Sequence, residues 1–513
     1  MSEEKKKVEN EVLKSETAQA EGRVLEFWNK SNTFKKSEEK EAPNGQFTFY
    51  DGPPFATGEP HFGHILAGTI KDAIPRYYVM NGKRVVRKWG WDCHGLPLEN
   101  IIEKELGLEN KKDIEEYGIE KFNDSANSKV LRFADYWGEV IPKLGRWVDM
   151  DNSYRTMDTT YTESVWWSFN EIYKKGLIYE GFKSMHYCPR CGTTLSNFEV
   201  NLGYKDIKDL SVTVEFELED SPKTYVLAWT TTPWTLPGNM ALAINSKAVY
   251  NKVKVKSEKG KTFIVAKERI EKIFKDQEYK IIDEFDGVKI VGKKYKPVFD
   301  YYVNEDIEGK ENAWKIYGAD FVTLEEGTGI VHLAPAFGSD DLELAQKKGI
   351  PIVHHVDLEG KFKKEVIDFA GVFVKQKDDH QATDVEIIKY LAGKGLLFSK
   401  EKIEHSYPHC WRCATPLLNY ATSSWFLETT KIKDKIISEN KAIKWVPENI
   451  RDGRMGKWLE GMRDWAISRS RYWGAPLPVW KCEECEKIKV VGSIDEIRKE
   501  TKSSNQYFVI RHG

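Results

Sequence analysis

Residues 46–64 read QFTFYDGPPFATGEPHFGH, and this stretch decides the fold. Its first six residues alternate in polarity like a β-strand, and the Gly/Pro-rich turn at 52–58 cannot continue as a helix. Beyond the turn, apolar residues recur at helical spacing as far as Tyr77. A strand, a glycine-rich loop and a helix in this order are typical of the opening unit of a nucleotide-binding α/β domain.

Two histidines, His61 and His64, stand at the start of this helix with Gly63 between them. A helix N-terminus carries partial positive charge and unpaired N–H groups, so phosphate is its natural ligand. Two imidazoles beside it can donate to phosphate oxygens during displacement at the α-phosphorus, and Gly63 leaves space for a flat base. The alternatives are a zinc-binding pair and ordinary surface histidines.

The composition narrows the class of protein. The 513 residues have room for roughly three domains. With 78 Lys plus Arg against 80 Asp plus Glu, the net charge is −2, which excludes a protein that coats nucleic acid through its overall charge. Residues 1–20 form a charged tail without the apolar segment of a secretory signal. No run of 18 apolar residues occurs, so we expect no membrane-spanning segment. Cysteines clustered in Cys-x-x-Cys pairs, in a chain without a signal, indicate the reducing cytoplasm.

Six of the seven cysteines fall in three Cys-x-x-Cys pairs. Residues 188–197 (CPRCGTTLSN) and 410–419 (CWRCATPLLN) share six of ten positions. Two such knuckles supply four thiolates for a tetrahedral zinc ion, whereas the alternative is two unrelated turns with free thiols. The third pair offers half of a second, incomplete site. The predicted zinc ligands are Cys188, Cys191, Cys410 and Cys413, with Cys482 and Cys485 in the incomplete site.

The periodicity of the apolar residues changes between the two Cys-x-x-Cys knuckles. Short alternating runs such as 212–216 and 252–255 dominate from about 205 to 335, and helical patterns return past about 420. We therefore expect two halves of one α/β domain on either side of a β-rich insertion.

Three motifs then resemble a known family. HFGH at 61–64, after two prolines, resembles the His-x-Gly-His signature of class I aminoacyl-tRNA synthetases. WGWDCHGLPLE at 89–99 resembles the isoleucyl enzymes, because valyl enzymes follow the Asp with His-Ala-Gly and leucyl enzymes with Ala-Phe. DWAISRSRYWG at 464–474 resembles a later motif of the same subfamily. The resemblance extends from about residue 21 to about residue 494.

The resemblance implies an α/β fold in which a Rossmann-like catalytic domain is interrupted by a β-barrel editing insertion with a zinc-knuckle neck. The implied parts are the tail 1–20, the first catalytic half 21–183, the insertion 184–413 with its neck at 184–200 and 405–420 and its barrel at about 205–400, and the second catalytic half 414–513.

The implied reaction is the ligation of isoleucine to tRNA(Ile), through isoleucyl-adenylate formed from ATP with Mg²⁺, by a monomer. By the same resemblance, Asp92 binds the α-ammonium of the amino acid, and Pro53 and Trp473 shape its apolar pocket. Read without the resemblance, Asp92 is a helix cap and Trp473 a core residue. The implied ATP-binding residues are Gly58, His61, Gly63 and His64, of which the two histidines are catalytic.

A second site is implied by residues 228–239 (AWTTTPWTLPGN) and 327–341 (GTGIVHLAPAFGSDD), which resemble the editing site of isoleucyl, valyl and leucyl enzymes. Editing of valyl-tRNA(Ile) is needed because one methylene is worth only about 1–3 kcal/mol in a pocket. Hydroxyls can hold the terminal ribose and position water, while a carboxylate binds the ammonium. A plain strand-end turn would also explain the threonines. The implied editing residues are Thr230, Thr231, Thr232, Thr235, His332 and Asp341.

Two features depart from the family pattern. No Lys-Met-Ser-Lys-Ser loop occurs, so we expect an N-terminal portion that is deficient in adenylation on its own. Residues 507–513 (YFVIRHG) resemble the opening of histidine phosphatases, or do so by chance. The alternative functions are a valyl-tRNA synthetase and a tRNA-deacylating or tRNA-binding module without synthetase activity.

Overall fold

The computed structural model describes residues 15–258 and 260–501. The described residues divide into two compact units, the first formed by 15–108, 112–171 and 472–501, the second by 109–111, 172–258 and 260–471. The boundaries given above for the catalytic halves and the editing insertion stay a prediction. Most of the charged tail and all of 507–513 lie outside the described residues.

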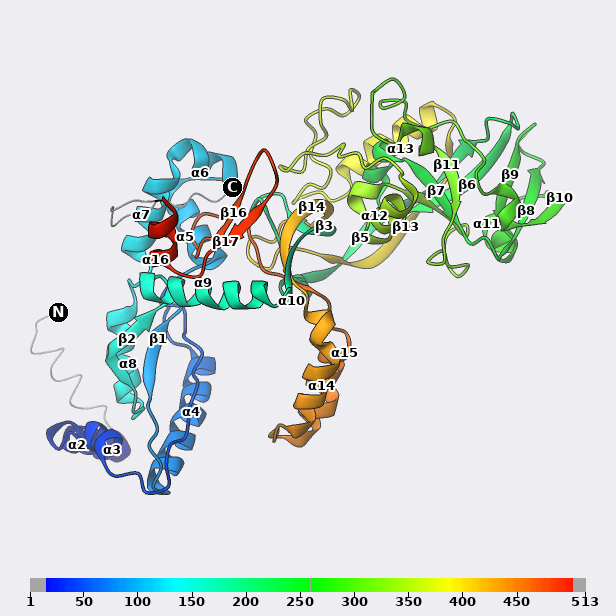
Figure 1. Ribbon diagram of the computed structural model, residues 1–513. Helices are drawn as coiled ribbons and strands as arrows, with labels where there is room; N and C mark the ends of the chain where they lie inside the picture. The colour runs from blue at the N-terminus through cyan, green and yellow to red at the C-terminus, as the bar shows by residue number, and fades with distance from the viewer. Residues whose placement is uncertain (1–14, 259, 502–513) are drawn as a thin grey trace, which may run out of the picture. The chain divides into compact units, whose positions relative to one another are not determined.

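The first unit is built mainly from helices (Figure 1). Its helices are α2 (Glu16–Lys30), α3 (Thr33–Glu39), α4 (Phe62–Met80), α5 (Leu96–Leu106), α6 (Lys111–Tyr117), α7 (Ile119–Lys129), α8 (Ala134–Lys143), α9 (Thr159–Lys174) and α16 (Ile494–Thr501). Its strands are β1 (Lys88–Trp91), β2 (Asp149–Arg155), β16 (Val479–Lys481) and β17 (Ile488–Val490). β1 and β2 pair in parallel, and β16 and β17 form an antiparallel hairpin.

Large aromatic side chains fill the core of this unit. Trp89 and Trp91 of β1 and Trp137 of α8 pack with Phe122 and Ile102, and each is at most 5% exposed. The sequence contains 17 Trp, 23 Tyr and 24 Phe. In this unit several of these side chains fill the core.

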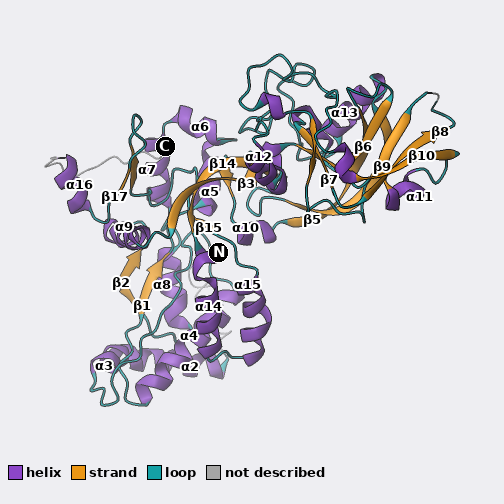
Figure 2. Ribbon diagram, turned by 45° about the vertical axis from the view of Figure 1, so that its right-hand side comes forward, coloured by secondary structure: helices purple, strands orange, loops and turns teal. Residues whose placement is uncertain are grey.

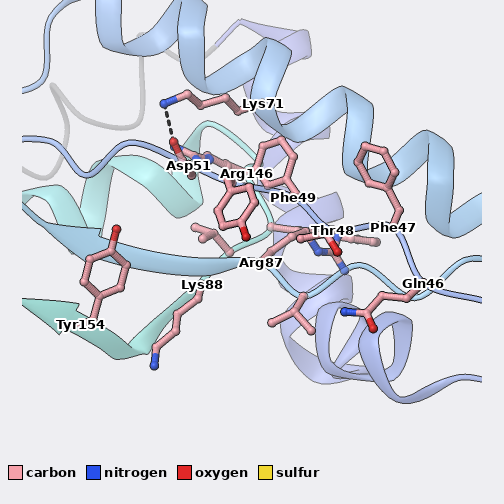
Figure 3. A pocket seen from close by; sticks show the side chains of 14 residues that line it. Gln46, Phe47, Thr48, Phe49, Asp51, Lys71, Arg87, Lys88, Arg146 and Tyr154 are labelled. Carbon is pink, nitrogen blue, oxygen red and sulfur yellow. Dashed lines mark hydrogen bonds and ion pairs between the residues drawn. The ribbon is translucent and has the colours of Figure 1, made fainter. Parts of the chain in front are cut away.

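The expected strand at 46–51 belongs to no ladder. Phe47 N donates to Arg84 O and Asp92 N to Pro54 O, both at 2.9 Å, so the segment is tied to its neighbours only near its two ends. A cavity of about 200 Å³ borders it, lined also by Lys88 and Tyr154 (Figure 3). The segment forms only a single parallel bridge, between Gln46 and Arg84, and no strand ladder, because a ladder depends on a neighbouring strand.

One face of α4 is apolar and exposed. Its buried residues are Gly68, Pro75 and Val79. Phe62 is 89% exposed and Met80 76%. The exposed apolar residues recur every three or four positions: Phe62, Leu66, Ile70, Ile74, Tyr77 and Met80.

The second unit is rich in strands (Figure 2). Its strands are β3 (Ile178–Cys188), β4 (Thr193–Thr194), β5 (Tyr204–Glu217), β6 (Thr224–Thr230), β7 (Ala241–Ile244), β8 (Val249–Val255), β9 (Thr262–Ala266), β10 (Tyr279–Asp286), β11 (Lys315–Gly318), β12 (Ile330–Leu333), β13 (Leu397–Pro408), β14 (Leu418–Leu427) and β15 (Trp465–Ala466). Its helices are α10 (Asn197–Asn201), α11 (Ile270–Ile273), α12 (Ser339–Lys348), α13 (Ala382–Gly393), α14 (Lys433–Ala442) and α15 (Gly456–Glu460), with the 3₁₀-helix η1 (Pro233–Gly238).

A mixed nine-stranded sheet dominates the described part of this unit. Seven strands follow the order β10-β8-β9-β6-β12-β7-β11, while β5 pairs with both β6 and β13. The predicted alternating runs 212–216 and 252–255 lie in β5 and β8, which confirms that both runs are strands. A separate antiparallel ladder joins β3 to β14, from Ile178↔Leu427 to Tyr187↔Leu418. This ladder brings the Cys-x-x-Cys pair at 188–191 close to the pair at 410–413.

Among the described residues, no helix combines the length and the apolar character needed to cross a bilayer.

Candidate functional site

His61 and His64 cap the N-terminus of α4. Gly63 N donates to His61 Nδ1, and His61 N donates to His64 Nδ1, both at 3.1 Å. Because Nδ1 of each ring is an acceptor, the neutral ring carries its proton on Nε2 and presents a donor. The two rings stack with centroids 3.7 Å apart. Burial lowers the pKa of His64, with further lowering from His61 and Lys71. This pair can donate two hydrogen bonds to an anion.

Trp137 is a neighbour that sequence reasoning missed. Its Nε1 donates to Gly58 O at 2.7 Å, and its ring meets His64 edge-on with centroids 4.9 Å apart. Trp137 is 1% exposed, so it fixes both the glycine turn and His64 against the core. A single tryptophan without a motif around it carries no signal for such a role.

Asp51 ties the turn to α4 and to a loop, and it was also missed. Its carboxylate forms ion pairs with Lys71 of α4 and with Arg146 (Figure 3). The next two residues are Gly52 and Pro53. The ion pairs therefore fix the start of the turn that carries the predicted pocket residue.

The predicted amino-acid site joins residues that are far apart in the sequence. Asp92 N donates to Pro54 O at 2.9 Å, which brings the turn beside Asp92. Trp473 Nε1 donates to Cys93 O at 2.6 Å, 380 residues away. Gly95 N donates to Trp473 O at 3.2 Å. The segment 92–95 is thus hydrogen-bonded both to the Gly/Pro turn and to Trp473.

The Asp92 carboxyl is suited to a cation. Burial raises its pKa, while hydrogen bonds from the His94 backbone and the Thr156 side chain lower it. None of the described residues forms an ion pair with Asp92. An ammonium group would supply the missing partner.

Glu99 positions Trp473 and was missed as well. Its Oε1 accepts from Tyr472 N at 3.1 Å and from Trp473 N at 2.7 Å. The carboxylate is fully buried, so it fixes the backbone of the aromatic pair. Glu99 ends the motif quoted above, but its role appears only in three dimensions.

The threonine turn lies where β6 runs into η1. Thr230 Oγ1 and Thr232 Oγ1 are 3.2 Å apart, and Thr232 Oγ1 is 3.3 Å from Thr235 Oγ1. Thr235 Oγ1 lies 2.8 Å from His332 Nε2. Four of the predicted editing residues therefore form one chain of polar contacts, in which Thr231 takes no part.

The tautomer of His332 follows from its neighbours. Asn239 Nδ2 contacts His332 Nδ1 at 3.4 Å and donates to Ala241 O at 2.9 Å, while Asn239 Oδ1 accepts from Tyr295 OH at 2.7 Å. Nδ1 is thus the acceptor, and Nε2–H donates to Thr235. Burial lowers the pKa of His332 to about 4, so the ring is neutral near pH 7.

Asp341 stands in the first turn of α12. Its Oδ2 accepts from Ala334 N at 2.8 Å, two residues beyond His332. A Cβ on Gly338 would lie 2.7 Å from the Asp341 Cγ, so only glycine fits beside this carboxylate. Burial raises the pKa of Asp341 to about 7. A partly buried carboxyl without a cation can receive an ammonium group.

Four cysteine sulfurs converge at the end of the β3–β14 ladder. The Sγ atoms of Cys188, Cys191, Cys410 and Cys413 all lie within 4.8 Å of one another. Cys413 Sγ is 3.5 Å from Cys188 Sγ and 3.6 Å from Cys191 Sγ. Zn–S bonds of 2.3 Å in a tetrahedron require sulfurs about 3.8 Å apart, so the donor set fits zinc. Cys482 and Cys485 are exposed in the turn of the β16–β17 hairpin.

Comparison with known proteins identifies the family of this chain. The family described as tRNA synthetases class I (I, L, M and V) matches residues 23–509. The isoleucine–tRNA ligase of Treponema denticola is 47% identical, over 95% of this chain and 46% of its own length. That of Clostridium tetani is 48% identical, over 94% and 45%. The chain thus spans a little under half the length of these curated relatives.

Among solved structures, a LeuRS of Agrobacterium radiobacter K84, in a ternary complex with tRNA and LeuAMS, is 17% identical. The match covers 92% of this chain and 52% of that chain, with a TM-score of 0.34. The family match extends over nearly all the described residues, and it includes His61, His64, Asp92, Asp341 and Trp473. This chain belongs to the class I tRNA synthetases, in the group that comprises the I, L, M and V enzymes.

Proposed function

We propose that this chain is part of an isoleucine–tRNA ligase that activates isoleucine with ATP and Mg²⁺, transfers it to tRNA(Ile) and hydrolyses valyl-tRNA(Ile). The curated relatives support the amino acid, because both are isoleucine–tRNA ligases at 47–48% identity. The motif at 89–99 supports it independently, because Cys93-His94-Gly95 follows Asp92.

In activation, the isoleucine ammonium binds Asp92 while its side chain lies against Pro53 and Trp473. The isoleucine carboxylate attacks the α-phosphorus, the bond from this phosphorus to the β-phosphate oxygen breaks, and pyrophosphate leaves. The Nε2–H groups of His61 and His64 donate to the phosphate oxygens, where negative charge develops in this step. Gly58 and Gly63 leave room for the nucleotide. The Asp51 ion pairs and the Trp137 contact keep this arrangement in place before substrates bind.

In editing, the ammonium of the wrongly attached valine binds Asp341. The threonine hydroxyls hold the terminal ribose and a water molecule, and His332 orients Thr235 through its Nε2–H. His332 acts as a neutral donor, because burial keeps its pKa far below 7. The proposal places this chemistry in a β-barrel insertion attached to a Rossmann-like domain, in a monomeric cytoplasmic enzyme.

Zinc bound by Cys188, Cys191, Cys410 and Cys413 would cross-link the two strands of the neck and leave no open coordination position. Its role is structural. Cys482 and Cys485 supply two further thiolates of an incomplete site.

The single observation that carries the proposal is the hydrogen bond from Trp473 Nε1 to Cys93 O, which joins Trp473 to the residue after Asp92 across 380 residues. The test is hydrolysis of valyl-tRNA(Ile) by the 513-residue chain, alongside isoleucine-dependent ATP–pyrophosphate exchange. We expect measurable hydrolysis, and exchange near background because the sequence lacks the lysine loop.

Asp341→Ala should abolish the hydrolysis while folding stays normal, because it removes the ammonium anchor. Asp340→Ala is the matched control, since it removes the exposed neighbouring carboxyl. Normal hydrolysis by the Asp341→Ala protein would refute the editing assignment, and robust exchange by the unaltered chain would refute our account of the catalytic residues.

A further inference from the structure

A buried ion cluster lies behind the threonine turn. Lys375 Nζ donates to Asp209 Oδ2 at 2.6 Å, to Asp384 Oδ2 at 2.7 Å and to His380 O at 3.2 Å. Both carboxylates are fully buried, and the Lys375 side chain is 1% exposed. No step of the proposed chemistry uses these charges.

Stability is a poor reason for such a cluster. Burial raises the pKa of Asp384 to about 7 despite the neighbouring Lys375, and removing ions from water costs several kcal/mol each. Apolar side chains of the same volume often serve stability as well or better. A buried ion cluster is more useful for fixing geometry, so its contacts beyond the ions matter.

One contact leads directly into the threonine turn. Asp384 Oδ1 accepts from Trp234 N at 3.2 Å. Trp234 O in turn accepts from His355 Nε2 at 3.0 Å. Buried side chains therefore hold both peptide groups of Trp234, which lies between Thr232 and Thr235. These two threonines carry the hydroxyl contact at 3.3 Å that leads to His332.

We propose that Asp384, held by Lys375, is a positioning residue for the hydrolytic site. Its carboxylate fixes the Trp234 N–H and so sets the threonine hydroxyls relative to His332, without touching the substrate. The inference rests on the proposed editing function and names a residue outside the motifs that suggested it.

The cluster contains its own matched control. Removing either Asp384 or Asp209 leaves Lys375 paired with one carboxylate, so both variants keep a balanced ion pair. Both carboxyls are fully buried, and both losses should cost comparable stability. Asp384 alone of the two contacts the turn.

The first experiment compares Asp384→Ala with Asp209→Ala in single-turnover hydrolysis of valyl-tRNA(Ile). We expect the rate constant to fall about 10- to 100-fold for Asp384→Ala, with the tRNA concentration at half-maximal rate changed less than about twofold. Asp209→Ala should stay near the unaltered rate despite a similar loss of thermal stability. Asp384→Asn, which keeps an oxygen for the Trp234 N–H, should recover most of the rate. Equal rates for the two alanine variants would overturn the proposal.

A second readout does not depend on the activity. In protein labelled with ¹⁵N-tryptophan, the backbone amide resonance of Trp234, identified with Trp234→Phe, should shift most in Asp384→Ala, which removes the acceptor oxygen. It should shift less in Asp384→Asn, which replaces a charged acceptor by a neutral one, and least in Asp209→Ala and Asp209→Asn. The asparagine variants also serve if an alanine variant does not fold. A resonance that moves no further in the Asp384 variants than in the Asp209 variants would overturn the inference. If the unaltered chain fails to hydrolyse valyl-tRNA(Ile) but the resonance shifts, the proposed function fails and the positioning contact stands.

Discussion

Asp341 combines a proposed catalytic task with a cost in stability. Its pKa of about 7 in the fold lies above the 3.8 of an unperturbed aspartate. Between these two pH values the folded chain holds a proton that the unfolded chain has released, so the free energy of unfolding falls as pH rises from about 4 to about 7. Above pH 7 the folded state bears the full cost of the buried charge.

We therefore predict that Asp341→Asn is more stable than the unaltered chain at pH 8, by about 1–3 kcal/mol, because an amide is never charged. The difference should shrink toward pH 4. Thermal unfolding followed at several pH values measures this. Asp340→Asn, at the exposed neighbouring position, is the control and should change little. A pH-independent difference between Asp341→Asn and the unaltered chain would contradict the assigned pKa.

At the scale of single residues, the sequence predicts candidate site residues that belong to motifs. It does not reveal the residues that position those side chains. His61, Asp92 and Asp341 are recognisable because their neighbours form recurring patterns. Asp51, Trp137 and Asp384 are not, because their roles depend on partners that lie far away in the sequence. A buried carboxylate such as Asp384 looks like any other acidic residue until the fold encloses it.

At the scale of elements, local pattern predicts the type of an element better than its partners. The alternating runs at 212–216 and 252–255 are present as strands. The segment 46–51 forms one bridge, Gln46 to Arg84, but no ladder, and α4 continues past Pro75 to Met80. Strand pairing is a contact between distant segments, so periodicity alone cannot supply it.

The two knuckles also belong to this scale, because each is a turn at the end of a strand. We predict at least one tightly bound zinc ion per chain, and its loss in Cys188→Ser and in Cys410→Ser. Three thiolates bind zinc less tightly than four, and the two knuckles contribute equally. Metal analysis of the purified proteins checks this. Cys482→Ser should keep the ion, and an unchanged content in both knuckle variants would exclude the shared site.

At the scale of the whole molecule, a near-neutral net charge is combined with an exposed apolar face on α4. The net charge of −2 offers little electrostatic repulsion between molecules. The exposed apolar face of α4 described above presents six large apolar residues to solvent. Continuous apolar surface of this kind binds hydrophobic dyes even in a native protein.

We predict that the folded chain binds the dye ANS, and that Leu66→Gln combined with Ile70→Gln reduces the fluorescence without lowering the helix content. Both positions are more than half exposed, so the substitutions remove no buried contact. Ile367→Gln, at an isolated site that is 75% exposed, should leave the dye signal unchanged. Equal fluorescence for the double variant would place the dye elsewhere.

The ladder between β3 and β14 has a consequence for how the molecule folds. Its pairing brings Cys188 beside Cys413, 225 residues away along the chain. Closing a loop of that length carries an entropic cost that no local contact offsets, whereas β8 and β9 can pair across a short connection. We therefore expect the strands between the two knuckles to pair first, which shortens the effective distance between β3 and β14. If zinc binds as proposed, its site is completed last, and the thiols of Cys188 and Cys191 stay without a metal until Cys410 and Cys413 have been synthesised.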